Sequence, residues 1–375
     1  MNGVRHLYVH LPFCAHRCGY CDFVTVVGRS AEHAAYADAL LVELVRERHV
    51  LAPLVDTVFV GGGTPTFTEL DSLGRILEAL PPASELTVEA NPETVTGELA
   101  ALLREHRVTR VSLGAQSFQP HLLAVLERRA EPDDVRRAVH TLRDACIDNI
   151  SLDLLYGIPG QGAADLDRDL AEALALAPEH LSVYELEAKP GTRFTHAHGE
   201  ELARQAEAME GYFERVVEAL TVAGYRWYET ANFCLAPERA DGRDLRAQHN
   251  LGYWLGHDYL GLGIGAVSTL GSTRRRNRAS LGHYVAALHA GEEPPREVEA
   301  LDDETRLRER LMLGLRLDVP LALDGLDPAL DRERLVRLTS LGLTSLWRGA
   351  DGSEALVLTR RGRFLGGGVT AELLA

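Results

Sequence analysis

The stretch Thr57-Val58-Phe59-Val60-Gly61-Gly62-Gly63-Thr64-Pro65 decides the fold. Its nearly continuous apolar run predicts a buried strand, and the glycines and proline predict that this strand ends in a tight loop. Thr68 is a plausible N-cap for a following helix that carries Glu69 and Asp71 in its first turn. The stretch therefore predicts one unit made of a strand, a glycine loop and a helix.

The same unit repeats along the first half of the chain. Further apolar strands are expected at residues 7–11, 85–89, 110–114, 149–153 and 180–184, with helical patterns between them; Ser30 is a plausible N-cap of the first helix. Apolar strands that alternate with helices predict a parallel sheet, because the crossover helices cover both of its faces. We expect an α/β fold, an incomplete parallel (β/α)6 barrel of the TIM type, with an open doubly wound sheet as the alternative.

The second half of the chain no longer shows this regular alternation of strands and helices. A long helix is expected over about 201–223 and a strand at 225–229, followed by a connector rich in glycine and aromatic residues. Helices near 303–317 and 331–340 then precede a hairpin of 343–347 with 355–359, which predicts a smaller C-terminal α+β domain of winged-helix-like appearance. The expected domains are 1–235, the partial barrel; 236–300, the connector; and 301–375, the C-terminal domain.

Composition limits the function classes. The chain has 375 residues, 46% of them hydrophobic, and a formal charge of −16, which opposes binding to nucleic acid and allows at most peripheral contact with an anionic membrane. No apolar run approaches the roughly 20 residues that span a bilayer, and the N-terminus has no signal-peptide pattern, so we expect a cytoplasmic protein. The acidic balance also favours a packing or partner role over DNA binding for the C-terminal domain.

Three cysteines lie within eight residues, at Cys14, Cys18 and Cys21. The pattern Cys-x3-Cys-x2-Cys offers three thiolates, the soft ligands of iron–sulfur clusters, and leaves one iron without a protein ligand. A zinc site is the alternative, and it would need His10, His16 or a distant cysteine as its fourth ligand. The two other cysteines, Cys146 and Cys234, are expected to be buried thiols.

Polar residues follow the ends of successive expected strands. They are Glu89, Gln116 and Asp153, with Arg128 on a following helix. Each one alone is more often a helix cap or a satisfied buried group, but a barrel builds its site from such residues at one rim. An acid and an amide suit ribose hydroxyls, and Arg128 suits a carboxylate. The glycine loop can admit a small charged group close to its backbone, and it lacks the lysine of a phosphate-binding loop.

These motifs together resemble a known family. The cysteine triad, Gly61-Gly62-Gly63-Thr64-Pro65, Glu-Ala-Asn-Pro from Glu89, Gly-Ala-Gln-Ser-Phe from Gly114 and Asp-Leu-Leu-Tyr-Gly-Ile-Pro from Asp153 resemble the radical S-adenosylmethionine (SAM) enzymes of the oxygen-independent coproporphyrinogen III oxidase group. The likeness runs from Tyr8 to about Leu270. Within the group, Cys21-Asp22-Phe23, Trp227-Tyr228-Glu229 and His249-Asn250-x-x-Tyr253-Trp254 are similar to the haem chaperone branch.

The resemblance implies two cofactors. Cys14, Cys18 and Cys21 would hold a [4Fe-4S] cluster whose open iron binds SAM, and an electron donor would reduce the cluster. The implied SAM contacts are Tyr8, Tyr20, Gly62, Gly63, Thr64, Glu89, Gln116, Arg128 and Asp153. Among them, Gly63 and Thr64 would lie near the methionyl amine, Arg128 near the carboxylate, Gln116 and Asp153 near the ribose, and Tyr20 against the adenine.

The branch decides the expected function. Oxidases of the group carry another cysteine where this chain has Phe23, and they have a longer segment than the thirteen residues that precede Cys14 here. Both departures disfavour decarboxylation of coproporphyrinogen, so no catalytic residue is assigned. The branch implies a haem chaperone that binds haem and passes it to a recipient protein. The alternatives are the oxidase reaction, another radical SAM transfer, and a zinc-binding interaction protein.

The motif that starts at His249 is associated with haem in that branch. His249 would be the axial ligand of the haem iron, and Tyr253 and Trp254 would form an aromatic wall. The alternative is structural: His249 and Asn250 would hold a buried loop above the two aromatic rings. The basic run Arg274-Arg275-Arg276-Asn277-Arg278 would contact haem propionates, or form a solvated loop.

Overall fold

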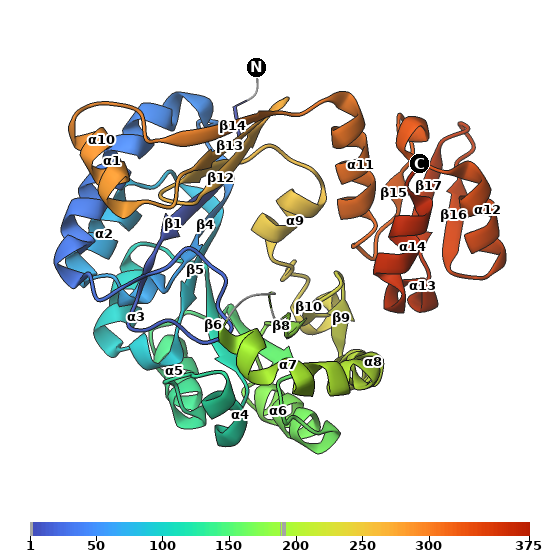
Figure 1. Ribbon diagram of the computed structural model, residues 1–375, viewed down its shortest axis with the longest axis horizontal. Coiled ribbons are helices and arrows are strands. Elements are labelled where there is room, and N and C mark those ends of the chain that lie inside the picture. The colour runs from blue at the N-terminus through green and yellow to red at the C-terminus, as the bar shows by residue number, and fades with distance from the viewer. Residues whose placement is uncertain (1–2, 188, 190–192) are drawn as a thin grey trace.

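The computed structural model describes residues 3–187, 189 and 193–375, and its centre is a curved, mostly parallel sheet (Figure 1). Six parallel strands correspond to the six that the sequence predicts: β1 (His6–Leu11), β4 (Val55–Gly62), β5 (Ala83–Ala90), β6 (Arg110–Gln116), β7 (Ile150–Tyr156) and β8 (His180–Glu185). Each pairs with the next one in chain order. In a doubly wound sheet the strand order reverses at a switch point, so this order confirms the partial barrel.

Shorter strands extend both edges of this sheet. β11 (Leu260–Leu262) pairs in parallel with β1, while β10 (Asn232–Leu235) and β9 (Tyr225–Trp227) are antiparallel beyond β8. Within the described residues β9 and β11 do not pair, so the barrel stays open. The sequence reading placed β11 in a glycine-rich connector. Gly261 explains the difference, because a Cβ there would lie 2.1 Å from the carbonyl oxygen of Val267; this glycine permits a close approach of two backbones inside a strand.

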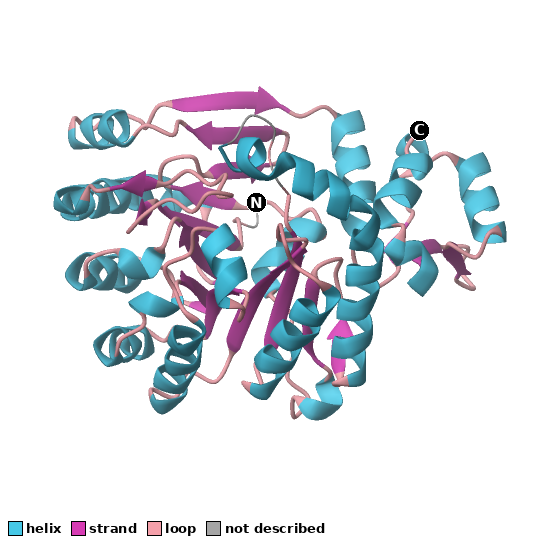
Figure 2. Ribbon diagram, turned by 60° about the horizontal axis from the view of Figure 1, so that its bottom comes forward, coloured by secondary structure: helices cyan, strands magenta, loops and turns pink. Residues whose placement is uncertain are grey.

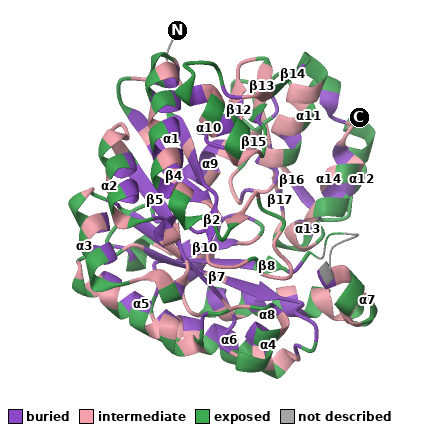
Figure 3. Ribbon diagram, turned by 60° about the vertical axis from the view of Figure 1, so that its left-hand side comes forward, coloured by how far each residue is buried: buried purple, intermediate pink, exposed green. Residues whose placement is uncertain are grey.

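Helices cover the outer face of the barrel, with their apolar sides against the strands and their exposed sides to solvent (Figures 1 and 3). They are α1 (His33–Glu47), α2 (Leu70–Ala79), α3 (Gly97–Glu105), α4 (Pro120–Val125), α5 (Pro132–Asp144), α6 (Ala163–Ala175) and α8 (Met209–Val222), whereas α7 (Arg193–Gln205) packs through Phe194 on Tyr20. Figure 2 shows the strands fanned beside these helices. The strands are buried on both faces, as the apolar runs predict.

Three local predictions about helices were wrong. Ser30 begins a short 3-10 helix, and α1 starts after Glu32 without a side-chain cap. Thr68 is not a cap either: α2 starts after Glu69, and no described group bonds the buried hydroxyl of Thr68. The long helix expected over about 201–223 is interrupted by a 3-10 turn at Ala206–Ala208.

The connector folds onto the barrel as α9 (Gln248–Trp254) and a separate antiparallel sheet. This small sheet contains β12 (Val267–Leu270), β13 (Thr273–Asn277) and β14 (Arg296–Ala300), with α10 (Leu281–His289) between the last two strands. The basic run therefore lies mostly in strand β13. It is tied to α1 through Arg296, which donates to both Glu43 and Glu47, two buried carboxylates.

The C-terminal residues have a hydrophobic core of their own. It is built from α11 (Asp303–Gly314), α12 (Arg332–Ser340), α13 (Arg360–Phe364), α14 (Gly366–Leu373) and a sheet of β15 (Leu321–Ala322), β17 (Glu354–Leu358) and β16 (Thr344–Arg348). The predicted hairpin is β16 with β17. These elements lie to one side of the barrel (Figure 1). No helix among the described residues has both the length and the apolar character needed to cross a membrane.

Candidate cofactor site

The three clustered cysteines lie at the C-terminal end of β1. Cys14 is buried in β2 (Phe13–Cys14), which pairs with β3 (Val26–Val27), and Cys18 and Cys21 are half-buried in the loop between these strands. All three line one cavity of 130 Å³. Burial raises the pKa of the Cys14 thiol to about 11, so in the absence of a metal this thiol stays protonated. No three His, Cys, Asp or Glu side chains in the described parts of the chain are grouped as for a single metal ion.

The donors that a zinc site would recruit have other partners. Both ring nitrogens of His10 are hydrogen-bonded, to the Tyr8 hydroxyl at 3.0 Å and to the carbonyl oxygen of Val24 at 2.8 Å. His16 lines the cysteine cavity, but its Nε2 lies 2.5 Å from the carbonyl oxygen of Glu127. Cys234 is buried beside His180, at the start of β8 and therefore at the opposite end of the strands.

The glycine loop at the end of β4 supports the cysteine strand. The amides of Gly63 and Thr64 donate to the carbonyl oxygens of Leu11 and Phe13, each at 2.8 Å. A Cβ on Gly63 would lie 2.4 Å from the carbonyl oxygen of Pro12, so only glycine permits this approach. The contact brings the Oγ1 of Thr64 to 3.4 Å from the Sγ of Cys14.

Two buried carboxylates lie beside the cysteines. Glu89, in β5, accepts a hydrogen bond of 3.0 Å from the amide of Gly62, and Asp153, in β7, accepts from the hydroxyl of Ser112 at 3.1 Å. Burial, together with the charge of Asp153, raises the pKa of Glu89 to about 7. Burial likewise raises the pKa of Asp153 to about 6, against the lowering effect of its serine hydrogen bonds. The pKa values of both acids therefore lie close to neutral pH when no ligand faces them.

Arg128 brings a guanidinium to the same cavity. Its Nη2 donates to the Oδ1 of Asn91 at 2.9 Å and to the carbonyl oxygen of Gly114 at 2.8 Å, and its Nη1 lies 3.7 Å from the Sγ of Cys18. The Nε is buried, and no described group accepts its hydrogen. A buried donor without a partner is costly, so this side chain is suited to an anionic ligand.

The structure brings most of the candidate SAM contacts together. The cysteine cavity is lined by Tyr20, Gly62, Gly63, Thr64, Glu89, Gln116, Arg128 and Asp153. Gln116 reaches it through a β-bulge at the end of β6, where its own backbone has a φ of 63°. Tyr8 instead lines an adjoining cavity of 250 Å³ inside the barrel, which shares Gly62, Glu89 and Asp153 with the first. Phe23 is 70% exposed and lines both cavities.

The candidate haem residues do not line the cysteine cavity. His249 is only 1% exposed, and both ring nitrogens have partners: Nδ1 lies 2.8 Å from the Oγ1 of Thr57, and Nε2 lies 2.8 Å from the Tyr253 hydroxyl. Burial lowers the pKa of His249 to about 3, so the ring is neutral. The ring of Trp254 lies under the guanidinium of Arg316, whose Cζ is 4.5 Å from the ring centroid.

Sequence reasoning missed two residues of the site, Asn91 and Ser112. Asn91 stands in the Glu-Ala-Asn-Pro motif, which was a usable signal, and it positions Arg128. Ser112 gave no signal, because its role depends on β6 lying beside β7.

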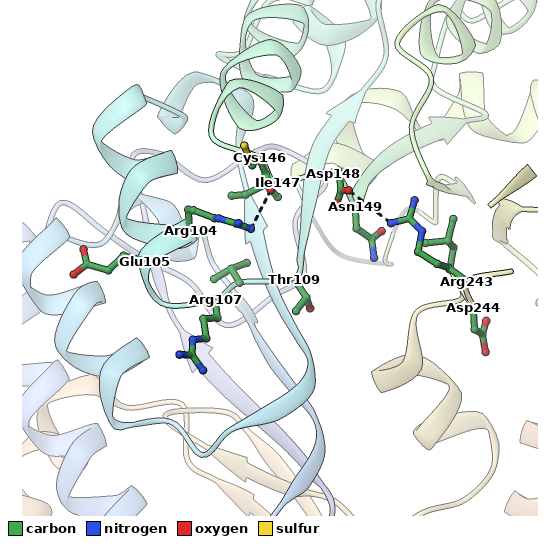
Figure 4. A pocket seen from close by; sticks show the side chains of 12 residues that line it. Arg104, Glu105, Arg107, Thr109, Cys146, Ile147, Asp148, Asn149, Arg243 and Asp244 are labelled. Atoms are coloured by element: carbon green, nitrogen blue, oxygen red, sulfur yellow. Dashed lines mark hydrogen bonds and ion pairs between the residues drawn. The ribbon is translucent and has the colours of Figure 1, made fainter. Parts of the chain in front are cut away.

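A larger cavity of 620 Å³ lies at the opposite, N-terminal ends of the strands (Figure 4). Cys146 lies at this rim, where Arg104 donates to its carbonyl oxygen at 3.2 Å. The prediction that Cys146 is buried was wrong: it is exposed, in a turn after α5 with a φ of 60°. None of the predicted site residues lines this cavity.

Comparison with known proteins agrees with this geometry. Residues 8–173 match the radical SAM superfamily. The chain is 32% identical to a protein named heme chaperone HemW from Bacillus subtilis, over 99% of both chains. It is 35% identical to a protein of that name from Mycobacterium tuberculosis, over 98% of this chain and 94% of the relative.

A solved structure supports the fold alone. The coproporphyrinogen III oxidase HemN of Escherichia coli, described as a radical SAM enzyme, superposes with a TM-score of 0.81 at 21% identity, over 99% of this chain and 90% of that one. Radical SAM proteins use a [4Fe-4S] cluster and SAM, which accounts for three clustered thiols beside a glycine loop. The chain therefore belongs to the radical SAM superfamily and, within it, to the family of proteins named heme chaperone HemW.

Proposed function

We propose that this protein is a haem chaperone, which binds haem as its cargo and delivers it to a recipient protein. The observation that carries the proposal is the full-length similarity, at 32–35% identity, to proteins named for that function. The match spans the barrel, the connector and the C-terminal residues, so it is not limited to the shared radical SAM region of 8–173. A reducing compartment such as the cytoplasm would suit the clustered thiols, two of which are only half-buried.

Cys14, Cys18 and Cys21 would hold the [4Fe-4S] cluster. All three line one cavity, and no other cysteine of the described residues lines it. When bound, the cluster and SAM supply one-electron chemistry, with electrons from a separate donor. The protein's own part is to hold Cys14 on strand β2, whose position is fixed by Gly63 and Thr64, and Cys18 and Cys21 in the loop that follows this strand.

The residues around this cavity would hold SAM by its polar ends. Arg128, with its buried Nε free of described partners, would pair with the carboxylate, and the backbone of Gly62 and Gly63 with Thr64 would meet the amine. Asp153 and Gln116 would accept from ribose hydroxyls. Tyr20 would pack on the adenine, while Glu89 and Tyr8 would contact SAM from the adjoining cavity.

Anaerobic reconstitution followed by haem titration tests the function. The expected result is an absorption spectrum of an iron–sulfur protein, saturable binding of haem, and transfer of that haem to a haem-free acceptor protein. Conversion of coproporphyrinogen III to protoporphyrinogen IX would replace this proposal with the oxidase reaction. Absence of saturable haem binding by the wild type would also overturn it.

Serine variants test the cluster ligands. Cys14→Ser, Cys18→Ser and Cys21→Ser should each abolish the iron–sulfur absorption, because each removes one thiolate ligand. Cys146→Ser is the matched control: its thiol is exposed at the other end of the barrel, so the variant should retain the full absorption. Zinc in place of iron in anaerobically purified protein would contradict the assignment.

A further inference from the structure

A cavity that faces the connector has the size and lining of a cofactor site. It measures 800 Å³, within the range of about 300–1,000 Å³ that is usual for bound small molecules. Its walls are the segment after α9, strand β13 and helix α11. Much of the lining is aliphatic, and two of these side chains, Leu255 and Met312, are 49% and 46% exposed. Exposed apolar side chains around a cavity favour an apolar ligand.

His257 offers this cavity an imidazole nitrogen. The residue is exposed and lines the cavity, and its Nδ1 lies 3.0 Å from the Nε2 of His6. None of the described groups bonds its Nε2. Histidines that bind metals have this arrangement, in which a partner on one ring nitrogen fixes the orientation of the other.

A hydrogen-bonded chain connects His257 with the His249 motif. His6 bonds Thr57 at 2.8 Å, Thr57 bonds His249 at 2.8 Å, and His249 bonds Tyr253 at 2.8 Å. Both ends of the chain, His257 and Tyr253, line the same cavity. Burial raises the pKa of Tyr253, which disfavours a phenolate ligand at that end. His249 itself is buried and has both ring nitrogens bonded, so it is placed to position the other residues.

Arginines complete the lining. Arg306, which donates to the carbonyl oxygen of Gly271, and Arg310, which donates to those of Ala322 and Asp324, extend from α11. Arg274, from the basic run, also lines the cavity, and it is bonded to Glu309 at 2.7 Å. Each guanidinium has five donors, and the pairs of N–H groups on Arg306 and Arg310 suit carboxylates.

We propose that this cavity is the haem site, with the Nε2 of His257 as axial ligand, the aliphatic lining against the ring, and Arg306 and Arg310 near the propionates. The inference rests on the proposed haem-chaperone function and assigns the ligand to a residue outside the His249 motif. His249 is then a positioning residue. It orients His257 through the hydrogen bonds of Thr57 and His6, and it bonds Tyr253 directly.

Haem titrations of ligand variants test the assignment. His257→Ala should weaken haem binding about 100-fold or more and remove the histidine-ligated resonance Raman and absorption signature, because even a partner of a metal ligand typically contributes 10–100-fold. Added imidazole should restore that signature, and His257→Cys should give a thiolate-type spectrum. His283→Ala, an exposed histidine on α10 that does not line the cavity, should behave as the wild type.

His249→Ala distinguishes a positioning residue from a ligand. It should lower haem affinity about 10–100-fold but retain the histidine-ligated signature. If His257→Ala binds haem like the wild type, and His249→Ala loses histidine ligation, the inference is wrong while the haem-chaperone function stands. If the wild type does not bind haem at all, the function itself fails.

The arginines have a separate test with haem dimethyl ester, in which both propionates are esterified. The double variant Arg306→Met, Arg310→Met should bind haem at least about tenfold more weakly, because it removes the charged hydrogen bonds to both propionates. It should bind the ester as the wild type does. Equal losses for both ligands would contradict propionate recognition by these arginines.

Discussion

Glu89 gives the ligand-free protein a specific response to pH. Its folded-state pKa of about 7 lies above the ordinary value of 4.5, so the folded protein keeps a proton that the unfolded chain has lost between these values. The free energy of unfolding should therefore fall as pH rises through this window. Glu89→Gln removes the titration, and its stability relative to the wild type should increase by on the order of 1 kcal/mol per pH unit from 4.5 to 7. Urea unfolding at pH 5, 6, 7 and 8 measures this difference.

The matched control is Glu105→Gln, at an exposed carboxylate that ends α3. This variant shows the effect of removing one acidic side chain that lines neither of the two cavities at the cofactor site. Each variant is compared with the wild type at the same pH because other groups also titrate. The pKa of His249 is lowered to about 3, so its contribution to stability is lost as pH falls below 6.5, opposite in sign to that of Glu89. The difference between variant and wild type removes this contribution. A constant difference between Glu89→Gln and the wild type would contradict the assigned environment of Glu89.

Arg128 should determine the affinity for SAM. Arg128→Met retains the length of the side chain and removes the donors for the carboxylate, so SAM affinity should fall about tenfold to a hundredfold, the range of one charged hydrogen bond. Isothermal titration of the cluster-loaded protein with SAM measures the loss. Arg129→Met, at the exposed neighbouring residue, is the control and should bind SAM normally. Equal affinity of the two variants would remove Arg128 from the proposed contacts.

The sequence predicts residues of the cofactor site well when they belong to a recognisable motif. Glu89, Asp153 and the cysteines could be found because they lie in or just after apolar strands, and the C-terminal parts of these strands meet at one rim. The partners of His249 could not be found in this way. Thr57 and His6 approach it only because α9 folds back over β1 and β4, and a single sequence does not encode that contact in any periodic pattern.

At the scale of elements, the glycine loop determines whether the cysteine strand can reach its place. Gly63→Ala would put a methyl group 2.4 Å from the carbonyl oxygen of Pro12, so β2 must shift away from the loop. The reconstituted variant should hold much less cluster than the wild type, as measured by iron content and absorption. Gly97→Ala is the control, because a Cβ there has no heavy atom of the described structure within 4 Å. Equal cluster content in both variants would show that the loop contact is not needed.

Strand prediction succeeded for the six parallel strands, which are long, and failed for the short strand β11. Each of the six parallel strands contains a run of five or more residues that is apolar or alternates between apolar and polar residues. The sequence predicted all six of them. β11 has three residues, including Gly261, and its identity as a strand depends entirely on pairing with β1 at the other end of the chain. Helix starts at Ser30 and Thr68 were misplaced because short 3-10 segments precede α1 and α2.

At the scale of the whole molecule, we propose that residues 301–375 form a domain that is held to the barrel through 225–229. Arg226 forms a bidentate pair with Asp318 at 2.7 and 2.9 Å, and Arg316 donates to Glu229 at 2.7 Å. Arg363 donates to the carbonyl oxygen of Trp227 at 2.7 Å. These contacts join the antiparallel edge of the main sheet to the second hydrophobic core.

Arg363 should be the contact on which this interface depends most. Its Cζ lies 3.6 Å from the centroid of the Trp227 ring, and burial lowers the pKa of the guanidinium to about 10. Arg363→Met retains much of the packing and removes the hydrogen bond and the cation–π contact, which together contribute roughly 1–3 kcal/mol. The calorimetric unfolding of the variant should separate into two transitions, with the first assigned by proteolysis to residues 301–375. Arg332→Met removes an exposed arginine whose partners, Asp327 and Glu354, lie within the same C-terminal part, so it should unfold as the wild type does. If Arg363→Met also shows the wild-type transition, the two cores unfold as one unit and the domain division is wrong.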